Sequence, residues 1–153
     1  MDFDLDAFLP YRLFQAAEHA SREFHPLYRS AYNLARTEWR VLFNIGQYGP
    51  LSSIDIARKS GLEKPKISRA VFKLEDRNWV HRIHDRTNRR THDLELTEQG
   101  KLAFSSLRNM ALDFDKRLKT HLGEDAARTL SEQLRLIEAF SFSSTLSEES
   151  QKK

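Results

Sequence analysis

Hydrophobic residues recur at intervals of three and four along most of the chain, which predicts a mainly helical protein. The first such pattern covers residues 3–32 and predicts one long helix or two. Pro10 would lie in the first turn of a helix that begins near Ala7, where a missing backbone donor is tolerated. Pro26 is expected to kink or break this helix late. So much apolar surface on a terminal helix requires another surface to pack against.

The next two predicted helices are short and lie close together in the sequence. The first runs from Thr37, its predicted cap, to Tyr48, and the Gly-Pro pair that follows ends it. The second begins at a capping sequence whose first residue is Ser52, and it ends at Gly61. Its expected core-facing residues are Ile54, Ile56 or Ala57.

Residues 62–79 predict a fourth helix with two unlike faces. It begins near Glu63 with Pro65 in its first turn, and Asn78 near its end suits the left-handed conformation of a C-cap. Its apolar stripe is Ile67, Val71 and Leu74. Lysine, arginine and hydroxyl side chains fall mostly off that stripe, so the helix can dock on a domain and still offer donors to DNA. Taken alone, it could equally be an ordinary solvated surface helix.

A short helix, a turn with glycine and a longer basic helix form the arrangement of a helix-turn-helix. The segment after it predicts a β-hairpin, with strands at Val80–His84 and Thr91–Leu96. The turn between them, residues 85–90, carries three arginines. Such a hairpin is a wing that can reach a minor groove, whose negative potential favours guanidinium.

Two more helices are predicted after the hairpin. Thr97 caps a helix that runs to about Leu122, and Gly123 separates it from a last helix that ends near Phe140. The first helix and these two carry apolar stripes that a winged helix does not need. We therefore expect them to form a dimer interface, which would place two recognition helices about 34 Å apart on two half-sites. A larger monomeric bundle is the alternative.

Charge is segregated along the chain. The net charge is +3, but residues 58–92 hold eleven Lys and Arg against four Asp and Glu, a net +7, and the remainder is −4. This separation indicates a polyanion-binding face on an acidic body, and a chance cluster is the alternative.

Composition excludes several classes of protein. The 153 residues, 39% of them hydrophobic, are enough for one domain with a real core. There is no cysteine, which excludes a disulfide scaffold and a thiolate metal site. The N-terminus is acidic where a signal peptide is basic, and no apolar run reaches about 18 residues, so we expect a soluble cytoplasmic protein.

Catalytic and metal-binding motifs are also missing from the sequence. There is no Gly-x-Ser-x-Gly, no His-Glu-x-x-His and no phosphate-binding glycine loop, so we expect neither an enzyme nor a cofactor. His81, His84 and His92 lie near one another in sequence. The first two are three apart on a strand and so face opposite sides, which argues against a shared metal.

Four stretches in order carry a specific family resemblance: FLPYRL (8–13), EWRVLFNIGQYGPLSSIDIARKSGL (38–62), KISRAVFKLEDRNWV (66–80) and LELTEQG (94–100). With them the chain resembles, from about Leu9 to Phe140, the MarR (multiple antibiotic resistance regulator) family of winged helix-turn-helix transcriptional regulators. The resemblance implies a single domain over residues 1–153. Its expected parts are a winged helix-turn-helix at about 35–97, dimerisation helices at 3–32 and 98–142, and a polar tail at 143–153.

The resemblance also implies a function. Members of the family bind palindromic operators as triangular dimers, usually as repressors, and would be associated with the nucleoid when bound to DNA. Many release DNA when a small aromatic or phenolic ligand enters a crevice between the dimer and DNA-binding regions. The alternative function is a helical dimeric interaction module whose winged helix docks a protein.

Site residues follow from the resemblance position by position. Ser68 and Arg69 match the pair that contacts phosphate and base edges, and Arg90 matches the minor-groove arginine of the wing. The acidic partner of that arginine is Asn88 here, and Ala35 stands where the family has a capping Ser or Thr. The predicted DNA-binding residues are Ser53, Lys64, Pro65, Lys66, Ser68, Arg69, Lys73, Arg86, Arg89 and Arg90. The Lys64–Lys66 start of the helix is expected to set sequence preference.

A ligand crevice is expected between the first, second and fifth helices. Its predicted lining is Arg12, His19, Tyr32, Trp39, Arg40 and Phe43. The cationic members would anchor an anionic ligand. Core packing or the dimer interface is the alternative role for each aromatic residue.

Overall fold

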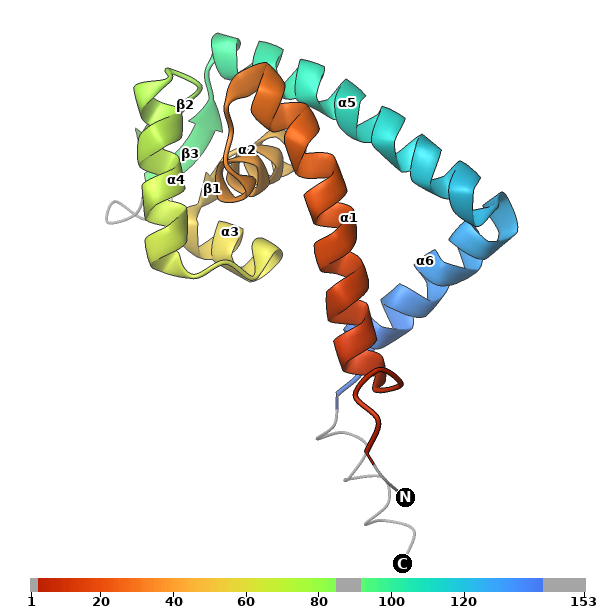
Figure 1. Ribbon diagram of the computed structural model, residues 1–153. Coiled ribbons are helices and arrows are strands. Elements are labelled where there is room, and N and C mark those ends of the chain that lie inside the picture. The colour runs from red at the N-terminus through yellow and green to blue at the C-terminus, as the bar shows by residue number, and fades with distance from the viewer. Residues whose placement is uncertain (1–2, 85–91, 142–153) are drawn as a thin grey trace, which may run out of the picture. The chain divides into compact units, whose positions relative to one another are not determined.

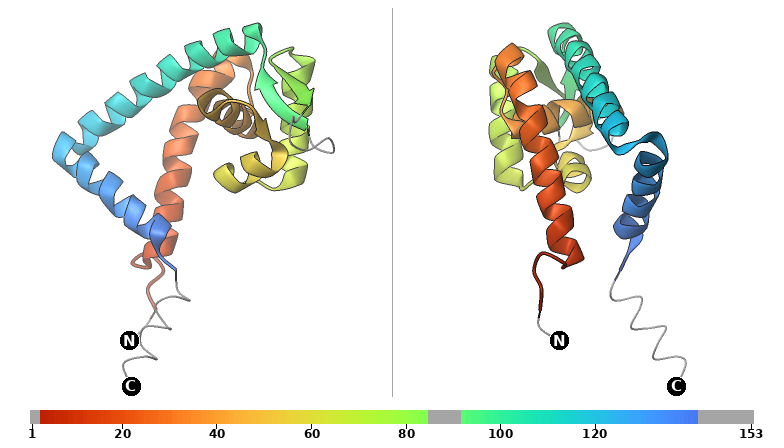
Figure 2. Two further views of the ribbon diagram at one scale, coloured as in Figure 1. Left: turned by 180° about the vertical axis from the view of Figure 1, so that it is seen from behind. Right: turned by 45° about the vertical axis from the view of Figure 1, so that its right-hand side comes forward.

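The computed structural model describes residues 3–84 and 92–141 (Figures 1 and 2). The elements are α1 (Leu9–Tyr32), α2 (Arg36–Tyr48), β1 (Leu51–Ser52), α3 (Ser53–Ser60), α4 (Lys64–Asp76), β2 (Val80–His84), β3 (His92–Leu96), α5 (Glu98–Leu122) and α6 (Glu124–Ala139). The predicted class, mainly helical with a small β-hairpin, is confirmed. The chain divides within α5 into two compact units, Met1–Leu112 and Asp113–Lys153. The predicted polar tail at 143–153 lies outside the described residues.

Helix α1 starts later than predicted and continues through Pro26 without a break. It begins at Leu9, so residues 3–8 are not helical, and Pro10 lies in its first turn. Its end is set by Asn33, which is left-handed at φ 49°. Of the two predicted effects of Pro26, a break is wrong, and a kink stays a prediction. Aromatic packing on both sides of the proline holds the helix, because Phe24 and Tyr28 are buried.

Helix α2 begins at Arg36, and its N-cap is Ala35, which cannot accept a hydrogen bond through its side chain. The carboxylate of Glu38 reaches back instead and accepts from the Ala35 backbone N–H at 3.1 Å. Half of a capping box therefore suffices here. The prediction that Thr37 caps this helix is wrong, because the chain is already helical one residue earlier.

Helices α3 and α4 end and begin largely as the sequence predicts. The Ser52 hydroxyl accepts from the Asp55 N–H at 3.2 Å, and Gly61 closes α3 in the left-handed conformation at φ 65°. Ile56 is fully buried, whereas Ile54 is exposed. The apolar stripe of α4 is buried together with Ala70, as expected for a helix docked by one face.

The sheet has three antiparallel strands in the order β1-β3-β2, one more than the sequence predicts. Leu51 of β1 pairs with Leu94, and Val80 of β2 pairs with Leu96. All four of these side chains are buried. Figures 1 and 2 show α2, α3 and α4 gathered around this sheet, so that α4 keeps one long side open to solvent.

The start of α5 is fastened to the turn that follows α4. Thr97 donates its hydroxyl proton to the Asn78 carbonyl at 2.6 Å, accepts from the Gly100 N–H at 3.0 Å, and donates its backbone N–H to the Trp79 carbonyl at 3.0 Å. A Cβ at Gly100 would overlap that Trp79 carbonyl oxygen. Asn78 itself is left-handed at φ 55°, as predicted.

Apolar side chains remain exposed at both ends of the described chain. In the second unit α6 buries none of its residues, and Leu130, Leu134 and Ile137 form an exposed stripe at helical spacing. In the first unit Phe8 and Phe14 are among the exposed apolar residues near the start of α1. Exposed apolar side chains at helical spacing, as in α6, are typical of an interaction site.

Candidate nucleic-acid interface

The open side of α4 is defined by the residues opposite its buried stripe. Successive residues turn by about 100° around a helix axis, so Pro65, Ser68, Arg69 and Phe72 lie on the side away from the core. All four are exposed. Two of them are the residues predicted to contact phosphate and base edges. The helix thus presents one exposed face in the part of the chain that the structure describes.

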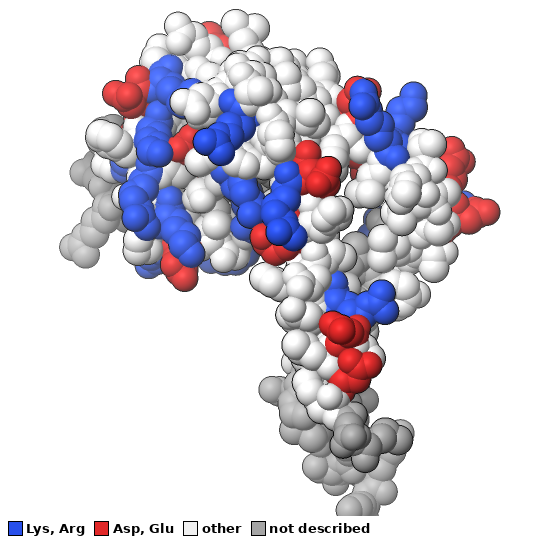
Figure 3. Space-filling model, viewed as in Figure 1, with Lys and Arg blue, Asp and Glu red and all other residues white. Residues whose placement is uncertain are grey.

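Basic residues flank this face and lie along the helix. Lys64 and Lys66 are exposed in the first turn, where the Lys66 ammonium pairs with Glu63 at 3.3 Å. The Arg69 guanidinium folds back on the helix, where its Nε donates to the Pro65 carbonyl at 3.3 Å. Ser53, the first residue of α3, is exposed as well. Figure 3 shows lysine and arginine side chains in a column along α4.

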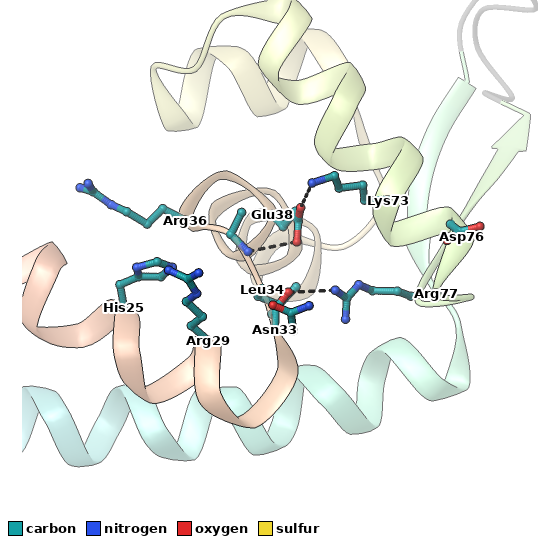
Figure 4. Close-up of a pocket in the computed structure, with 10 residues that line it drawn as sticks. His25, Arg29, Asn33, Leu34, Arg36, Glu38, Lys73, Asp76 and Arg77 are labelled. Atoms are coloured by element: carbon teal, nitrogen blue, oxygen red, sulfur yellow. Dashed lines mark hydrogen bonds and ion pairs between the residues drawn. The ribbon is translucent and has the colours of Figure 1, made fainter.

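Lys73 differs from the other predicted DNA contacts because its partner is a buried carboxylate on another helix. Its ammonium lies 3.1 Å from the carboxylate of Glu38 (Figure 4). The Glu38 side chain is only 4% exposed, whereas that of Lys73 is 62% exposed. The same carboxylate caps α2 through Ala35, so it joins the start of α2 to the side of α4.

Arg77 fastens the end of α4 to the end of α1. Its guanidinium donates to the Tyr32 carbonyl at 2.8 Å and to the Asn33 carbonyl at 2.9 Å. The last carbonyls of a helix lack partners within it, so a cation there is favourable. Arg77 holds α4 against α1, and the Glu38–Lys73 pair holds it against α2.

These contacts surround a pocket of about 450 Å³ (Figure 4). Its lining is His25, Arg29, Asn33, Leu34, Ala35, Arg36, Glu38, Lys73, Asp76 and Arg77. None of the six residues predicted to bind a ligand belongs to this lining. The pocket lies on the flank of α4, beside the open face rather than on it.

A further ion pair links α1 to α2. The Arg36 guanidinium makes two hydrogen bonds to the Glu18 carboxylate, at 2.8 and 3.2 Å. This hydrogen bonding lowers the pKa of Glu18 and raises the pKa of Arg36. Burial, in contrast, raises the pKa of the neighbouring Tyr28.

The strands of the predicted wing are described, but its tip is not. Arg82 on β2 binds the Glu75 carboxylate through two nitrogens, at 2.9 and 3.2 Å, and so ties the wing to α4. His81 pairs across the sheet with Glu95 at 3.5 Å. Arg86, Arg89 and Arg90, together with Asp85 and Asn88, lie outside the described residues.

The six predicted ligand residues do not form one cluster. The rings of Trp39 and Phe43 lie 4.3 Å apart, and Phe24, Tyr28 and Phe104 pack around them. Arg40 donates to the Ser60 carbonyl, and Tyr32 packs edge-on against Trp79. Arg12 and His19 are exposed on α1. The Trp39 indole N–H is buried and has no hydrogen-bond partner within the described part of the chain.

The described residues contain no candidate membrane span and no candidate metal site. Over residues 3–84 and 92–141, no helix combines the length and the apolar character that crossing a membrane requires. Within the same ranges no three His, Asp or Glu side chains gather in a way that could hold a metal ion.

Known proteins share this arrangement of helices and strands. Residues 34–92, from the end of α1 into β3, match the model of the MarR family. A MarR family transcriptional regulator of Silicibacter pomeroyi DSS-3, SPO1453, is 28% identical, with a TM-score of 0.78 over 92% of this chain and all of that chain. Residues 34–92 therefore match the MarR family, and most of the chain resembles a solved regulator of that family in fold.

Two other proteins resemble the chain over most of its length. The Bacillus subtilis (strain 168) protein YwoH, an uncharacterised HTH-type transcriptional regulator, is 22% identical over 121 residues, which are 79% of this chain and 84% of YwoH. The transcriptional repressor CouR, solved on a 23-mer DNA duplex, is 23% identical and has a TM-score of 0.77 over 90% of this chain and 99% of CouR. These proteins are transcriptional regulators rather than enzymes.

Sequence reasoning missed the residues that hold the MarR helix-turn-helix together. Glu38 is three positions after Ala35, a spacing that could have identified its capping role. Its pairing with Lys73 has no signal in the sequence, because the two residues belong to different helices and meet only through packing. The same is true of the Arg77 contacts with the end of α1.

Proposed function

We propose that the protein is a dimeric, sequence-specific DNA-binding repressor that acts on a palindromic operator. The observation that carries this proposal is the open, basic face of α4, which follows a capped short helix and a left-handed glycine turn. Helix α4 is then the recognition helix, with Ser68 and Arg69 at its centre. The likeness to CouR, solved on a DNA duplex, supports the same use of the fold.

Each part of the site has a physical role in the proposal. Ser53 donates a hydrogen bond to a phosphate, and the lysines of the first turn of α4 neutralise phosphates. Arg69 reaches a base edge, where a bidentate contact to guanine is the commonest pairing. Arg86, Arg89 and Arg90 extend the contact into a minor groove. Lys73 supports α4 through Glu38 and adds positive charge beside the groove. The cytoplasm is the proposed compartment, on the nucleoid when DNA is bound.

We propose that residues 1–153 form one such regulator, with a winged helix-turn-helix at about 35–97. The exposed stripes of α1 and α6 then form the interface with a second copy, because each is too apolar to remain in water. Two copies place two recognition helices on half-sites one helical turn apart. Binding should weaken when the dimer dissociates, since only one half-site remains occupied.

The test is binding to random duplex DNA as a function of salt. A dimer that neutralises about six phosphates should lose roughly a thousandfold in affinity between about 50 and 200 mM salt. Selection of bound sequences from a random pool should then return a palindrome. A protein that binds no duplex at low salt would refute the proposal and favour the alternative, a module that docks a protein partner.

Release of DNA by a small aromatic or anionic effector is the regulatory part of the proposal. Its support is the unpartnered Trp39 indole N–H beside the Phe43 ring, since a buried donor without an acceptor is costly. The effector would contact Trp39 and Phe43 and recruit Arg12, His19, Tyr32 or Arg40. Quenching of tryptophan fluorescence by 4-hydroxybenzoate, lost in Trp39→Phe, tests it. Quenching that persists in Trp39→Phe would place the effector elsewhere.

A further inference from the structure

One side chain on the open face of α4 has a chemistry that the proposed DNA contacts do not use. Phe72 is 70% exposed, and the residues one turn away from it on that face, Ser68, Arg69 and Asp76, are polar or charged. A phenyl ring in water is unfavourable, and these neighbours offer it no apolar surface. The ring is therefore available to a ligand that binds the basic face.

The position of Phe72 on the helix is central. The buried stripe points to one side, and at about 100° per residue Phe72 and Pro65 lie nearly opposite its centre. Ser68, one turn earlier, lies to one side of the ring, and Arg69 lies to the other. Any surface that contacts both of these residues must also cover the ring between them.

Contacts of Lys73 and Arg77 on one flank of α4 hold the helix so that the open face points away from the domain. Lys73 is held by the buried Glu38 carboxylate at 3.1 Å, and Arg77 is held by carbonyls at the end of α1. Helix α4 is thus fixed about its own axis on one side. The phenyl ring points away from these contacts and has no aromatic partner among the described residues.

Only one feature of a DNA major groove is apolar. The edges of the bases present donors and acceptors, and the C5-methyl group of thymine is the exception. The charge along this side of α4 favours a polyanion over an apolar peptide, because Lys64 and Arg69 have no carboxylate partner among the described residues and would stay unpaired against an apolar surface.

We propose that Phe72 reads a thymine methyl group in the major groove of each half-site, and so determines specificity at a position that Ser68 and Arg69 do not read. The inference rests on the proposed DNA-binding function. A contact to one methyl group buries about one carbon of apolar surface. It should therefore contribute roughly fourfold in affinity per half-site, which corresponds to about 0.8 kcal/mol at about 1.4 kcal/mol per tenfold.

The experiment compares thymine with uracil, which lacks only this methyl group. The operator is first selected from a random pool with the wild-type protein, and each thymine is then replaced by deoxyuridine in both half-sites at once. At one position the replacement should weaken wild-type binding roughly sixteenfold, the product of roughly fourfold at each of two half-sites. In Phe72→Ala the same replacement should have no effect, and selection should no longer enrich thymine there.

Two further variants make the result decisive. Phe72→Leu keeps an apolar side chain and should retain part of the discrimination. Tyr48→Ala removes another exposed aromatic side chain, 58% exposed at the end of α2, and should retain all of it. The proposal would be overturned if deoxyuridine weakened binding by Phe72→Ala as much as binding by the wild type. It would also be overturned if no thymine could be replaced with a loss of affinity. Either result would leave DNA binding itself intact. Absence of any DNA binding by the wild type would instead overturn the proposed function itself.

Discussion

Replacing Lys73 by methionine should destabilise the folded protein, because it strips a buried carboxylate of its only ion-pair partner in the described structure. Breaking a fully buried pair costs about 3–5 kcal/mol, whereas a fully exposed pair contributes about 0–1 kcal/mol. The Glu38 side chain is 4% exposed and that of Lys73 is 62% exposed, so the pair lies between these limits. We expect Lys73→Met to cost about 2 kcal/mol.

Glu38→Gln should cost less, about 1 kcal/mol, because the amide oxygen still accepts from the Ala35 N–H and the lysine returns to water. The double variant should be no worse than Lys73→Met alone, since no uncompensated charge remains. The double-mutant cycle should therefore give a coupling energy of about 1–2 kcal/mol.

The assay is urea unfolding at one fixed protein concentration, with thermal unfolding as a second measure. Lys73→Met should lower the melting temperature by roughly 4–8 °C, at about 2–4 °C per kcal/mol for a chain of this size. Arg69→Met is the matched control: it removes a cation from the same helix that has no carboxylate partner among the described residues, and it should stay within about 0.5 kcal/mol of wild type.

A coupling energy below about 0.5 kcal/mol would refute the reasoning, because the pair would then behave as an ordinary surface ion pair. Lys73 would in that case be free to act mainly on DNA. That role has its own signature: loss of a phosphate contact reduces the slope of log affinity against log salt by about one for each half-site.

Other parts of the molecule give separate predictions. Arg69→Ala should weaken specific DNA binding by about 1–3 kcal/mol if it reads a base, measured by titration against the selected operator, and an equal loss on random DNA would make it a phosphate contact instead. Arg90→Ala should weaken binding without lowering the melting temperature; a fall would make it structural. Leu134→Glu should give monomers in light scattering, whereas Glu132→Lys, a polar change on the same helix, should leave the dimer intact. Because hydrogen bonding to Arg36 lowers the pKa of Glu18 below its unfolded value, this pair stabilises the fold at neutral pH. That contribution is lost as the pH falls through the lowered pKa, so Glu18→Gln should unfold with a weaker dependence on acid pH than wild type.

Most elements of the fold could be predicted from the sequence because they rest on local signals. The Ser52 cap, the left-handed Gly61 and the buried stripe of α4 each follow from a few neighbouring residues, and all are present. Helix α1 shows the limit of local rules. Pro26 predicts a break, but burial of Phe24 and Tyr28 on either side of it outweighs the lost hydrogen bond.

The features that could not be predicted depend on residues far apart in the chain. The two-residue strand β1 is too short to show alternation, and only its pairing with β3 reveals it. The Glu38–Lys73 pair and the contacts of Arg77 form only after α1, α2 and α4 have packed. The roles assigned to the arginines of the wing and to the effector residues remain predictions.

The close approach of Gly100 to the Trp79 carbonyl has a mechanical consequence. Thr97 donates hydrogen bonds to the carbonyls of both Asn78 and Trp79. Because Gly100 has no side chain, the first turn of α5 can pack directly against the turn that ends α4. These contacts join the start of α5 rigidly to the end of α4. A rotation of the first turn of α5 should therefore move the end of α4 with it, because no flexible loop lies between them.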